Sequence, residues 1–127
     1  MPVRVRPSAP FFDGYAMQID CIFCKVINKS IPASVVAENE KVLVIKDIAP
    51  KASIHYLIIP KTHHSNIASL DLSKGTIPTD LFEMVQKLSK LDTRHSQFRL
   101  IINEGKNAGQ SVFHLHLHFL SGQLLEF

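Results

Sequence analysis

The chain has 127 residues, which suits one domain, because folding at this length buries about 65–70% of the surface that the unfolded chain exposes. Apolar residues make up 46% and charged residues 20%, a globular composition that argues against general disorder. The net charge of +3 permits an anionic ligand but is too small to argue for a nucleic-acid surface. No apolar run reaches the roughly 18 residues of a membrane span and no secretory signal is recognisable, so we expect a cytoplasmic protein without membrane or nucleic-acid partners.

Residues 1–16 differ from the rest of the chain, since they hold three prolines and have no helical or strand periodicity. We expect this segment to be a disordered or loosely attached arm, with Met17 as a second candidate start of the chain. Residues 17–127 are then expected to form a single domain.

A regular pattern begins after the arm. Asp20 or Cys21 can cap a short helix that ends before Pro32. The apolar side of this helix consists of Ile22, Phe23, Val26 and Ile27. Two strands are expected at 34–38 and 42–46, with a turn between them that makes them a hairpin. The next strand, IHYLIIP, occupies 54–60.

A longer helix and two further strands complete the pattern. The helix begins near Pro78, and its apolar stripe consists of Leu81, Met84, Val85, Leu88 and Leu91. Alternation predicts a fourth strand over 98–103, and a glycine-bearing loop separates it from a fifth strand at 112–120. His95 lies in a polar linker, where we expect it to be solvated. Strands that come first, with a helix inserted late, favour an α+β fold.

Three histidines recur at every second position of the fifth predicted strand, at His114, His116 and His118. Because side chains alternate across a strand, the three imidazoles should share one face, opposite leucines that point to the core. Three neighbouring imidazoles are costly to bury without partners, so this pattern indicates a functional site. The preceding Gly109, Gln110 and Ser111 can turn backbone N–H groups towards an anion beside the histidines.

The segments DCIFCKVINKSIP, HYLIIPKTH, INEG and GQSVFHLHLHFL resemble the histidine-triad (HIT) family of nucleotide hydrolases and transferases. The resemblance runs from about Asp20 to Gly122 and points to the branch of the histidine-triad nucleotide-binding proteins. It implies an α+β HIT fold, with an antiparallel sheet of about five strands, a short N-terminal helix and one longer helix. It also implies a homodimer.

The resemblance implies hydrolysis of a purine nucleoside 5′-phosphoramidate or another nucleotidyl conjugate. His116 would be the nucleophile that forms a nucleotidyl-histidine, which suits neutral imidazole near pH 7. His118 would contact the phosphate oxygens, Ser111 the phosphate or leaving group, and His55 would join a proton relay. Considered alone, His55 is equally a half-buried strand histidine. A dinucleoside polyphosphate hydrolase and a nucleotide-binding regulatory module with little turnover are the alternatives.

The same resemblance assigns the nucleotide contacts. Asp47 would accept hydrogen bonds from the ribose hydroxyls, with Asn103 as the second sugar contact, while Gly109 and Gln110 would hold the phosphate. The base would lie in an apolar slot formed by Ile22, Phe23, Val26 and Ile48, which discriminates bases weakly. Alternatively, Asp47 is an exposed turn residue and the four apolar residues are ordinary core.

Cys21 and Cys24 form a C-x-x-C motif, which supplies two of the four ligands that tetrahedral zinc requires. By resemblance to HIT members with this motif, one structural Zn²⁺ per chain would be bound by these two cysteines, His63 and His114. The side chain of the neighbouring His64 should face elsewhere. Alternatives are reduced cysteines beside a surface histidine pair, and a zinc protein whose histidines are all ligands. A redox pair is disfavoured because no thioredoxin-like βαβ pattern surrounds the motif.

Overall fold

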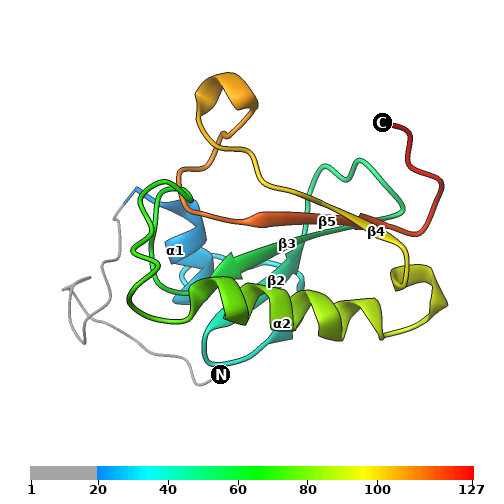
Figure 1. Ribbon diagram of the computed structural model, residues 1–127, viewed down its shortest axis with the longest axis horizontal. Coiled ribbons are helices and arrows are strands. Elements are labelled where there is room, and N and C mark those ends of the chain that lie inside the picture. Colours follow the sequence, from blue (N-terminus) through cyan, green and yellow to red (C-terminus); the bar gives the residue numbers. More distant parts are fainter. Residues whose placement is uncertain (1–19) are drawn as a thin grey trace.

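The computed structural model describes residues 20–127 (Figure 1), so the arm expected at 1–16 lies outside the described residues. Within the described residues, five strands form one antiparallel sheet in the order β1-β2-β3-β5-β4, accompanied by two α-helices and two short 3₁₀ helices. The elements are α1 (Ile22–Ile27), β1 (Val35–Glu38), β2 (Val42–Lys46), β3 (Ile54–Pro60), α2 (Ile77–Ser89), η2 (Thr93–His95), β4 (Phe98–Ile101), η3 (Lys106–Ala108) and β5 (Leu117–Ser121). The α+β class and the five-stranded antiparallel sheet are confirmed. Within residues 20–127, no helix is long and apolar enough to cross a bilayer.

Alternate residues of the central strands supply two separate apolar clusters, one on each face of the sheet. Val42, Val44 and Ile58 belong to the cluster that also contains the buried side of α2. The intervening residues Leu43, Ile45, Leu57 and Ile59 belong to the cluster that contains α1. Because both faces are covered, β2 and β3 are apolar almost throughout rather than alternating between apolar and polar.

The register places two histidines on the α1 face of the sheet. His55 of β3 lies opposite Leu120, and Leu57 lies opposite His118 of β5. Since side chains two residues apart share a face, His55, Leu57 and His118 all face the α1 side. Tyr56 belongs to the opposite face, and its ring stacks on Phe119 with centroids 5.9 Å apart. The two histidines and the apolar cluster that contains α2 therefore lie on opposite faces of the sheet.

The helices follow the predicted pattern, with differences at their ends. Cys21, rather than Asp20, caps α1, and its sulfur accepts a hydrogen bond from the Cys24 amide. The α2 helix begins at Ile77 beside the expected Pro78 and buries Leu81, Met84, Val85 and Leu88. Leu91, predicted to continue that stripe, lies beyond the helix end at Ser89 and is exposed.

The fifth strand was predicted at 112–120, but β5 begins only at Leu117, so the predicted start was wrong. The segment before β5 bends because two of its histidine side chains bind backbone carbonyls, which are then not free for strand pairing. His114 contacts the Pro60 carbonyl, and His116 contacts the His114 carbonyl. The three histidines therefore do not share one strand face as expected. The fourth strand also ends earlier than predicted, at Ile101.

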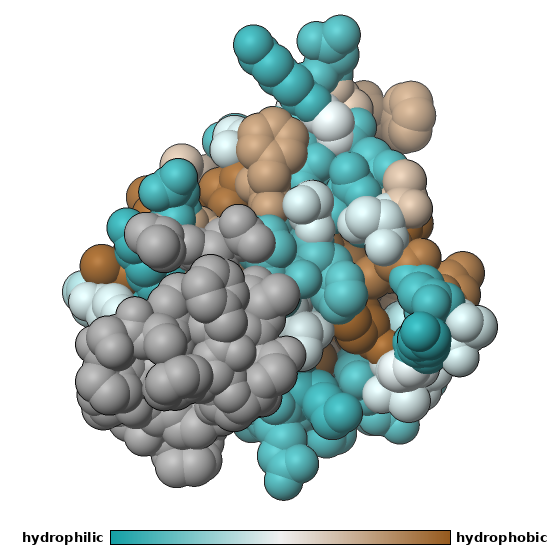
Figure 2. Space-filling model, turned by 90° about the vertical axis from the view of Figure 1, so that its left-hand side faces the viewer, coloured by the Kyte–Doolittle hydropathy of each residue, from teal (hydrophilic) through white to brown (hydrophobic). Residues whose placement is uncertain are grey.

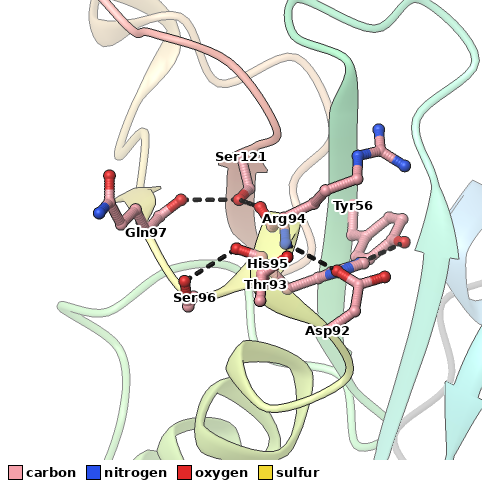
Figure 3. A network of polar contacts seen from close by, with 8 residues as sticks. All are labelled: Tyr56, Asp92, Thr93, Arg94, His95, Ser96, Gln97 and Ser121. Carbon is pink, nitrogen blue, oxygen red and sulfur yellow. Dashed lines mark hydrogen bonds and ion pairs between the residues drawn. The ribbon is translucent and has the colours of Figure 1, made fainter.

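His95 was expected in solvent and is instead buried, with 6% of its surface exposed. Its Nδ1 donates to the Asp92 carboxylate at 2.7 Å, so its Nε2 accepts from the Tyr56 hydroxyl at 3.0 Å (Figure 3). Beside it, the buried Ser121 hydroxyl donates to the backbone carbonyls of Arg94 and Gln97. The predicted polar linker is thus a hydrogen-bonded connection between α2 and β4, because its polar side chains satisfy one another.

Candidate active site and metal centre

The triad histidines lie where the bent segment enters β5. His116 is buried, and its ring packs edge-on against Phe23 of α1, with centroids 5.0 Å apart. The His118 ring lies next to the His116 ring, with centroids 5.1 Å apart. His114 points away into a cluster with the two cysteines. The sequence motif is therefore divided between two sites, and Phe23 contacts the histidines of both.

Backbone hydrogen bonding assigns the ring proton of His116. Its Nδ1 lies 2.7 Å from the His114 carbonyl oxygen. A carbonyl only accepts, so this nitrogen carries the proton and neutral His116 keeps its lone pair on Nε2. Burial is the largest cause that lowers the pKa of His116, and the charge of the neighbouring His114 ring lowers it further. The hydrogen bond to the His114 carbonyl and the Asp47 carboxylate raise this pKa by less. The ring is thus a neutral imidazole with a free lone pair.

Asp47, His55 and His118 form a hydrogen-bonded chain beside it. The Lys51 amide donates to His55 Nδ1 at 3.0 Å, so the proton of neutral His55 is on Nε2. That nitrogen lies 2.9 Å from His118 Nδ1 and 3.4 Å from the Asp47 carboxylate. Because His118 accepts at Nδ1, its own proton is on Nε2. The Asn103 side-chain amide lies 3.5 Å from that Nε2, and its oxygen must face the ring for a hydrogen bond to form, because an amide nitrogen and a protonated Nε2 are both donors.

Burial keeps these rings neutral. It is the largest cause that lowers the pKa of His118 to about 4, and the neighbouring His116 and His55 lower it further, against Asp47, which raises it. Burial also lowers the pKa of His55, against the attraction of Asp47 and with a smaller contribution from Lys51. At neutral pH, His55 and His118 therefore donate hydrogen bonds through the N–H groups of neutral rings.

The residues expected to hold the nucleotide lie in different environments. Phe23 and Val26 are buried in the apolar cluster that contains α1, like ordinary core residues, whereas Ile48 is fully exposed and Ile22 is 48% exposed. Asp47 is half-buried, and one carboxylate oxygen accepts from the Ala49 amide at 2.7 Å. The other oxygen faces His55. Apolar surface is thus available beside α1 and after β2, but Val26 does not contribute an exposed side chain.

The loop before the triad is held by one buried amide. Gln110 accepts from the Gly105 amide and donates to the carbonyls of Ser65 and Val112, at 2.8, 2.8 and 3.1 Å. Its side chain is therefore committed to the loop, which leaves backbone groups to meet an anion. Ser111, next to it, is exposed. Gly109 adopts φ +98°, a left-handed conformation that favours glycine.

The second site brings together the four predicted metal ligands. The sulfur of Cys21 lies 3.3 Å from His114 Nδ1, and that of Cys24 lies 3.4 Å from His63 Nδ1. The two imidazole nitrogens are 3.1 Å apart, and all four ligand atoms lie within 4.8 Å of one another. Ligands of a tetrahedral ion at usual Zn–S and Zn–N lengths are separated by roughly 3.3–3.8 Å. The cluster fits such an ion.

The protonation pattern also fits a metal. His114 Nε2 donates to the Pro60 carbonyl at 2.8 Å, so its Nδ1 carries a lone pair towards the cysteines, as a ligating histidine requires. The Cys21 thiol has its pKa lowered to about 3, chiefly by its hydrogen bond with Cys24, while burial raises it and His114 lowers it further. A thiolate is the form that binds metal. The contact with Pro60 therefore assigns an imidazole lone pair to the site, and the lowered pKa of Cys21 favours its thiolate.

Asp47, His55 and His118 form a second group whose ligand atoms lie close enough to hold an ion. Here the protonation pattern argues the other way. A metal at His55 Nε2 would require the proton on Nδ1, where the Lys51 amide already donates. The arrangement suits proton transfer better than metal binding.

A cavity of about 680 Å³ lies between the chain after β3 and the start of α2. Its lining includes Pro60, His64, Leu70 and Ile77, and no residue of the triad. On this side of the molecule, hydrophobic side chains are recessed between hydrophilic ones (Figure 2). The cavity is therefore not the nucleotide pocket that the resemblance implies.

Sequence reasoning missed the groups that fix the protons. The Lys51 amide and the carbonyls of Pro60 and His114 are backbone atoms, which any residue type would supply, so no sequence signal marks them. Only the C-x-x-C and histidine spacing indicated which rings would need such partners. The position of Phe23 between two histidines also emerges only in three dimensions.

Comparison with known proteins agrees with this geometry. Protein HitA of Neisseria gonorrhoeae is 38% identical over 101 residues, which cover 80% of this chain and 94% of that protein. A HIT family hydrolase from Clostridium thermocellum has a TM-score of 0.82 at 38% identity, with 87% of this chain and 97% of that chain covered. A histidine triad nucleotide-binding protein from Candida albicans has a TM-score of 0.70 at 30% identity, with 85% and 82% covered. A family model of the HIT domain matches residues 28–124, and the chain therefore belongs to the HIT family.

Proposed function

We propose that the chain hydrolyses a purine nucleoside 5′-phosphoramidate or a related nucleotidyl conjugate, through a nucleotidyl-histidine at His116. Membership of a family with hydrolase members supports a nucleotide hydrolase in general. The observation that carries the finer proposal is the hydrogen bond from His116 Nδ1 to the His114 carbonyl. It leaves Nε2 with a lone pair next to a ring that presents an N–H group.

In this mechanism His116 Nε2 attacks the α-phosphorus, and the bond to the leaving amine breaks as that amine takes up a proton from solvent water. A water molecule then attacks the phosphorus and gives up a proton to solvent, the P–N bond to His116 breaks, and the nucleoside monophosphate is released. His118 donates its Nε2–H to the phosphate oxygens, where negative charge grows in the transition state. Asp47 and His55 hold the His118 proton in that position. The exposed Ser111 contacts the phosphate or the leaving group.

The nucleoside contacts follow the same proposal. Asp47 and Asn103 bind the ribose hydroxyls, and the backbone at Gly109 and Gln110 meets the phosphate. The exposed apolar surface of Ile22 and Ile48, with Phe23 and Val26 behind it, receives the base. Apolar contacts carry little hydrogen-bond readout, so we expect at most a purine preference.

Hydrolysis of adenosine 5′-phosphoramidate tests the proposal. We expect turnover by the wild type and a loss of about 10³-fold or more in His116→Ala, since a covalent nucleophile has been removed. A mass increase of one adenylyl group on rapidly quenched wild type would report the intermediate. His64→Ala, which removes an imidazole outside the triad, should retain activity. Turnover only on a dinucleoside polyphosphate, or AMP binding without turnover, would replace the proposal with one of its alternatives.

The Cys21, Cys24, His63 and His114 cluster would hold one Zn²⁺ per chain, because two sulfur and two imidazole ligands match structural zinc sites. When bound, the ion would supply a structural cross-link rather than a reaction partner, since all four positions are filled by protein. Metal content of the purified protein measures this directly.

The proposal further includes a cytoplasmic homodimer. The strand β4 lies at one edge of the sheet, and apolar side chains at and after it, Phe98 and Ile102, are each 39% exposed. On α2, Phe82 is 60% exposed. An unpaired edge flanked by exposed apolar residues is a common site of self-association.

A further inference from the structure

The chain after β5 folds back beside the loop that joins β2 and β3, at one end of the sheet (Figure 1). Gln123 Oε1 accepts two hydrogen bonds from Ser53, at 2.6 Å from its amide and 2.8 Å from its hydroxyl. Further along, the Arg99 guanidinium of β4 donates to the carbonyls of Leu125 and Glu126. The tail is therefore held at two points, one of them on the β2–β3 loop.

Gly122 makes this approach possible. Its φ of +87° is left-handed, and a Cβ there would lie 3.1 Å from Ser53 Cβ and 3.2 Å from the Ile54 side chain. Any larger residue would face both backbone strain and a steric clash. The turn thus delivers Gln123 to Ser53 through a conformation that only glycine adopts easily.

The loop that receives this contact, residues 47–53, is mostly exposed. Its other hydrogen bonds run within the loop or to the start of β3: from Ala49 to Asp47, from Asp47 to the His55 carbonyl, and from Lys51 to Ala49 and His55. Among the described residues, the contact with Gln123 is the hydrogen-bonded link of this loop to a segment distant in sequence. Little else restrains the loop, because exposed residues bury few apolar contacts.

We propose that Gln123 is a positioning residue for the relay. Through Ser53 it holds the loop so that the Lys51 amide stays 3.0 Å from His55 Nδ1, which keeps the His55 proton on Nε2, towards His118. A loop that moves away would free Nδ1 to take the proton, and His55 would then no longer donate to His118. The catalytic consequence rests on the proposed hydrolase function, whereas the tautomer is a property of the folded chain alone.

The test compares Gln123→Ala, Gln123→Glu and the matched control Leu124→Ala, which truncates an 85% exposed neighbour in the same tail. Ring ¹⁵N spectra of His55 at alkaline pH report which nitrogen carries the proton. We expect Gln123→Ala to mix the two tautomers and to lower kcat about 10-fold with KM within about twofold. Gln123→Glu keeps an oxygen acceptor and should restore both, and Leu124→Ala should match the wild type.

A second variant guards against loss of the fold. Ser53→Ala removes one of the two hydrogen bonds and should shift the spectra and kcat in the same direction by less than Gln123→Ala. Unchanged His55 nitrogens in Gln123→Ala would overturn the proposal, as would a fall in kcat without a change of tautomer. If the wild type hydrolyses no phosphoramidate, the proposed function fails, yet the nitrogen spectra still decide whether Gln123 sets the tautomer.

Discussion

Ring protons in the site are assigned by backbone atoms rather than by other side chains. The carbonyl of Pro60 directs the unprotonated nitrogen of His114 towards the cysteines, and the carbonyl of His114 leaves Nε2 of His116 without a proton. The Lys51 amide donates to His55 Nδ1 and so leaves the His55 proton on Nε2. Since neutral imidazole has one donor and one acceptor, a single backbone partner determines which chemistry remains. In the proposed function, histidines alone would therefore serve as metal ligand, nucleophile and relay.

The lowered pKa of His118 predicts acid sensitivity of the fold. Between its ordinary value of 6.5 and the native value of about 4, the unfolded chain binds a proton that the folded chain does not. The free energy of unfolding should therefore fall as pH falls through this range, by less than about 1.4 kcal/mol per pH unit for this one group. Urea unfolding at several pH values between these limits measures the slope.

His118→Gln serves as the reference for that slope, because it removes the titrating ring and leaves every other acid-sensitive group in place. The wild type should lose more stability than the variant on acidification. Equal slopes in the two proteins would mean that His118 titrates normally in the folded state.

At the scale of elements, the local sequence pattern predicted those helices and strands whose ends do not depend on distant contacts. The strands β2 and β3 were predicted to the residue because each is a short apolar run bounded by turn residues, and the start of α2 was predicted because its apolar residues follow a period of 3.6. The beginning of β5 was not, since HLHLH alternates like a strand while two of its histidines bind backbone. His95 was missed for a related reason, because its burial depends on a tyrosine distant in sequence.

The buried side of α2 should dominate its contribution to stability. Leu88 is fully buried in the cluster on that face, so Leu88→Ala should lower the free energy of unfolding by about 2–5 kcal/mol through lost burial and a cavity. Lys87→Ala, on the exposed side of the same helix, should change it by less than about 0.5 kcal/mol. Chemical denaturation of both variants measures the difference, and similar losses would contradict the assigned orientation of α2.

In the proposed zinc site, the metal ion would tie α1 to the segment that carries His116. His63→Ala should abolish stoichiometric metal and lower the melting temperature by about 10 °C, because a structural ion contributes directly to folding. His64→Ala is the matched control, since its ring lies outside the cluster and only its backbone carbonyl holds Leu115. Elemental analysis with thermal unfolding reports both effects. Retention of a full equivalent of metal by His63→Ala would exclude the assigned ligand set.

For the whole molecule, the candidate site was predictable as residue types but not as an arrangement. Sequence spacing selected the cysteines, His63 and the triad, and all four proposed metal ligands lie together. Their division into two sites, with Phe23 between them, depends on how α1 packs on the sheet. The role of a tail residue such as Gln123 depends on a contact across 70 positions, which local pattern cannot carry.

The unpaired edge of the sheet at β4 predicts self-association of the protein. The strand β4 pairs with β5 and with no other strand of the described residues, so its outer N–H and C=O groups are available to a second copy. The wild type should sediment at twice the chain mass of 14.3 kDa. Ile102→Asp should shift it towards monomer, because a charge beside this edge would be desolvated on association. Leu72→Asp, 74% exposed in the loop before α2, should remain dimeric. A wild type that sediments as a monomer at every concentration would instead show that β4 does not pair with a second copy.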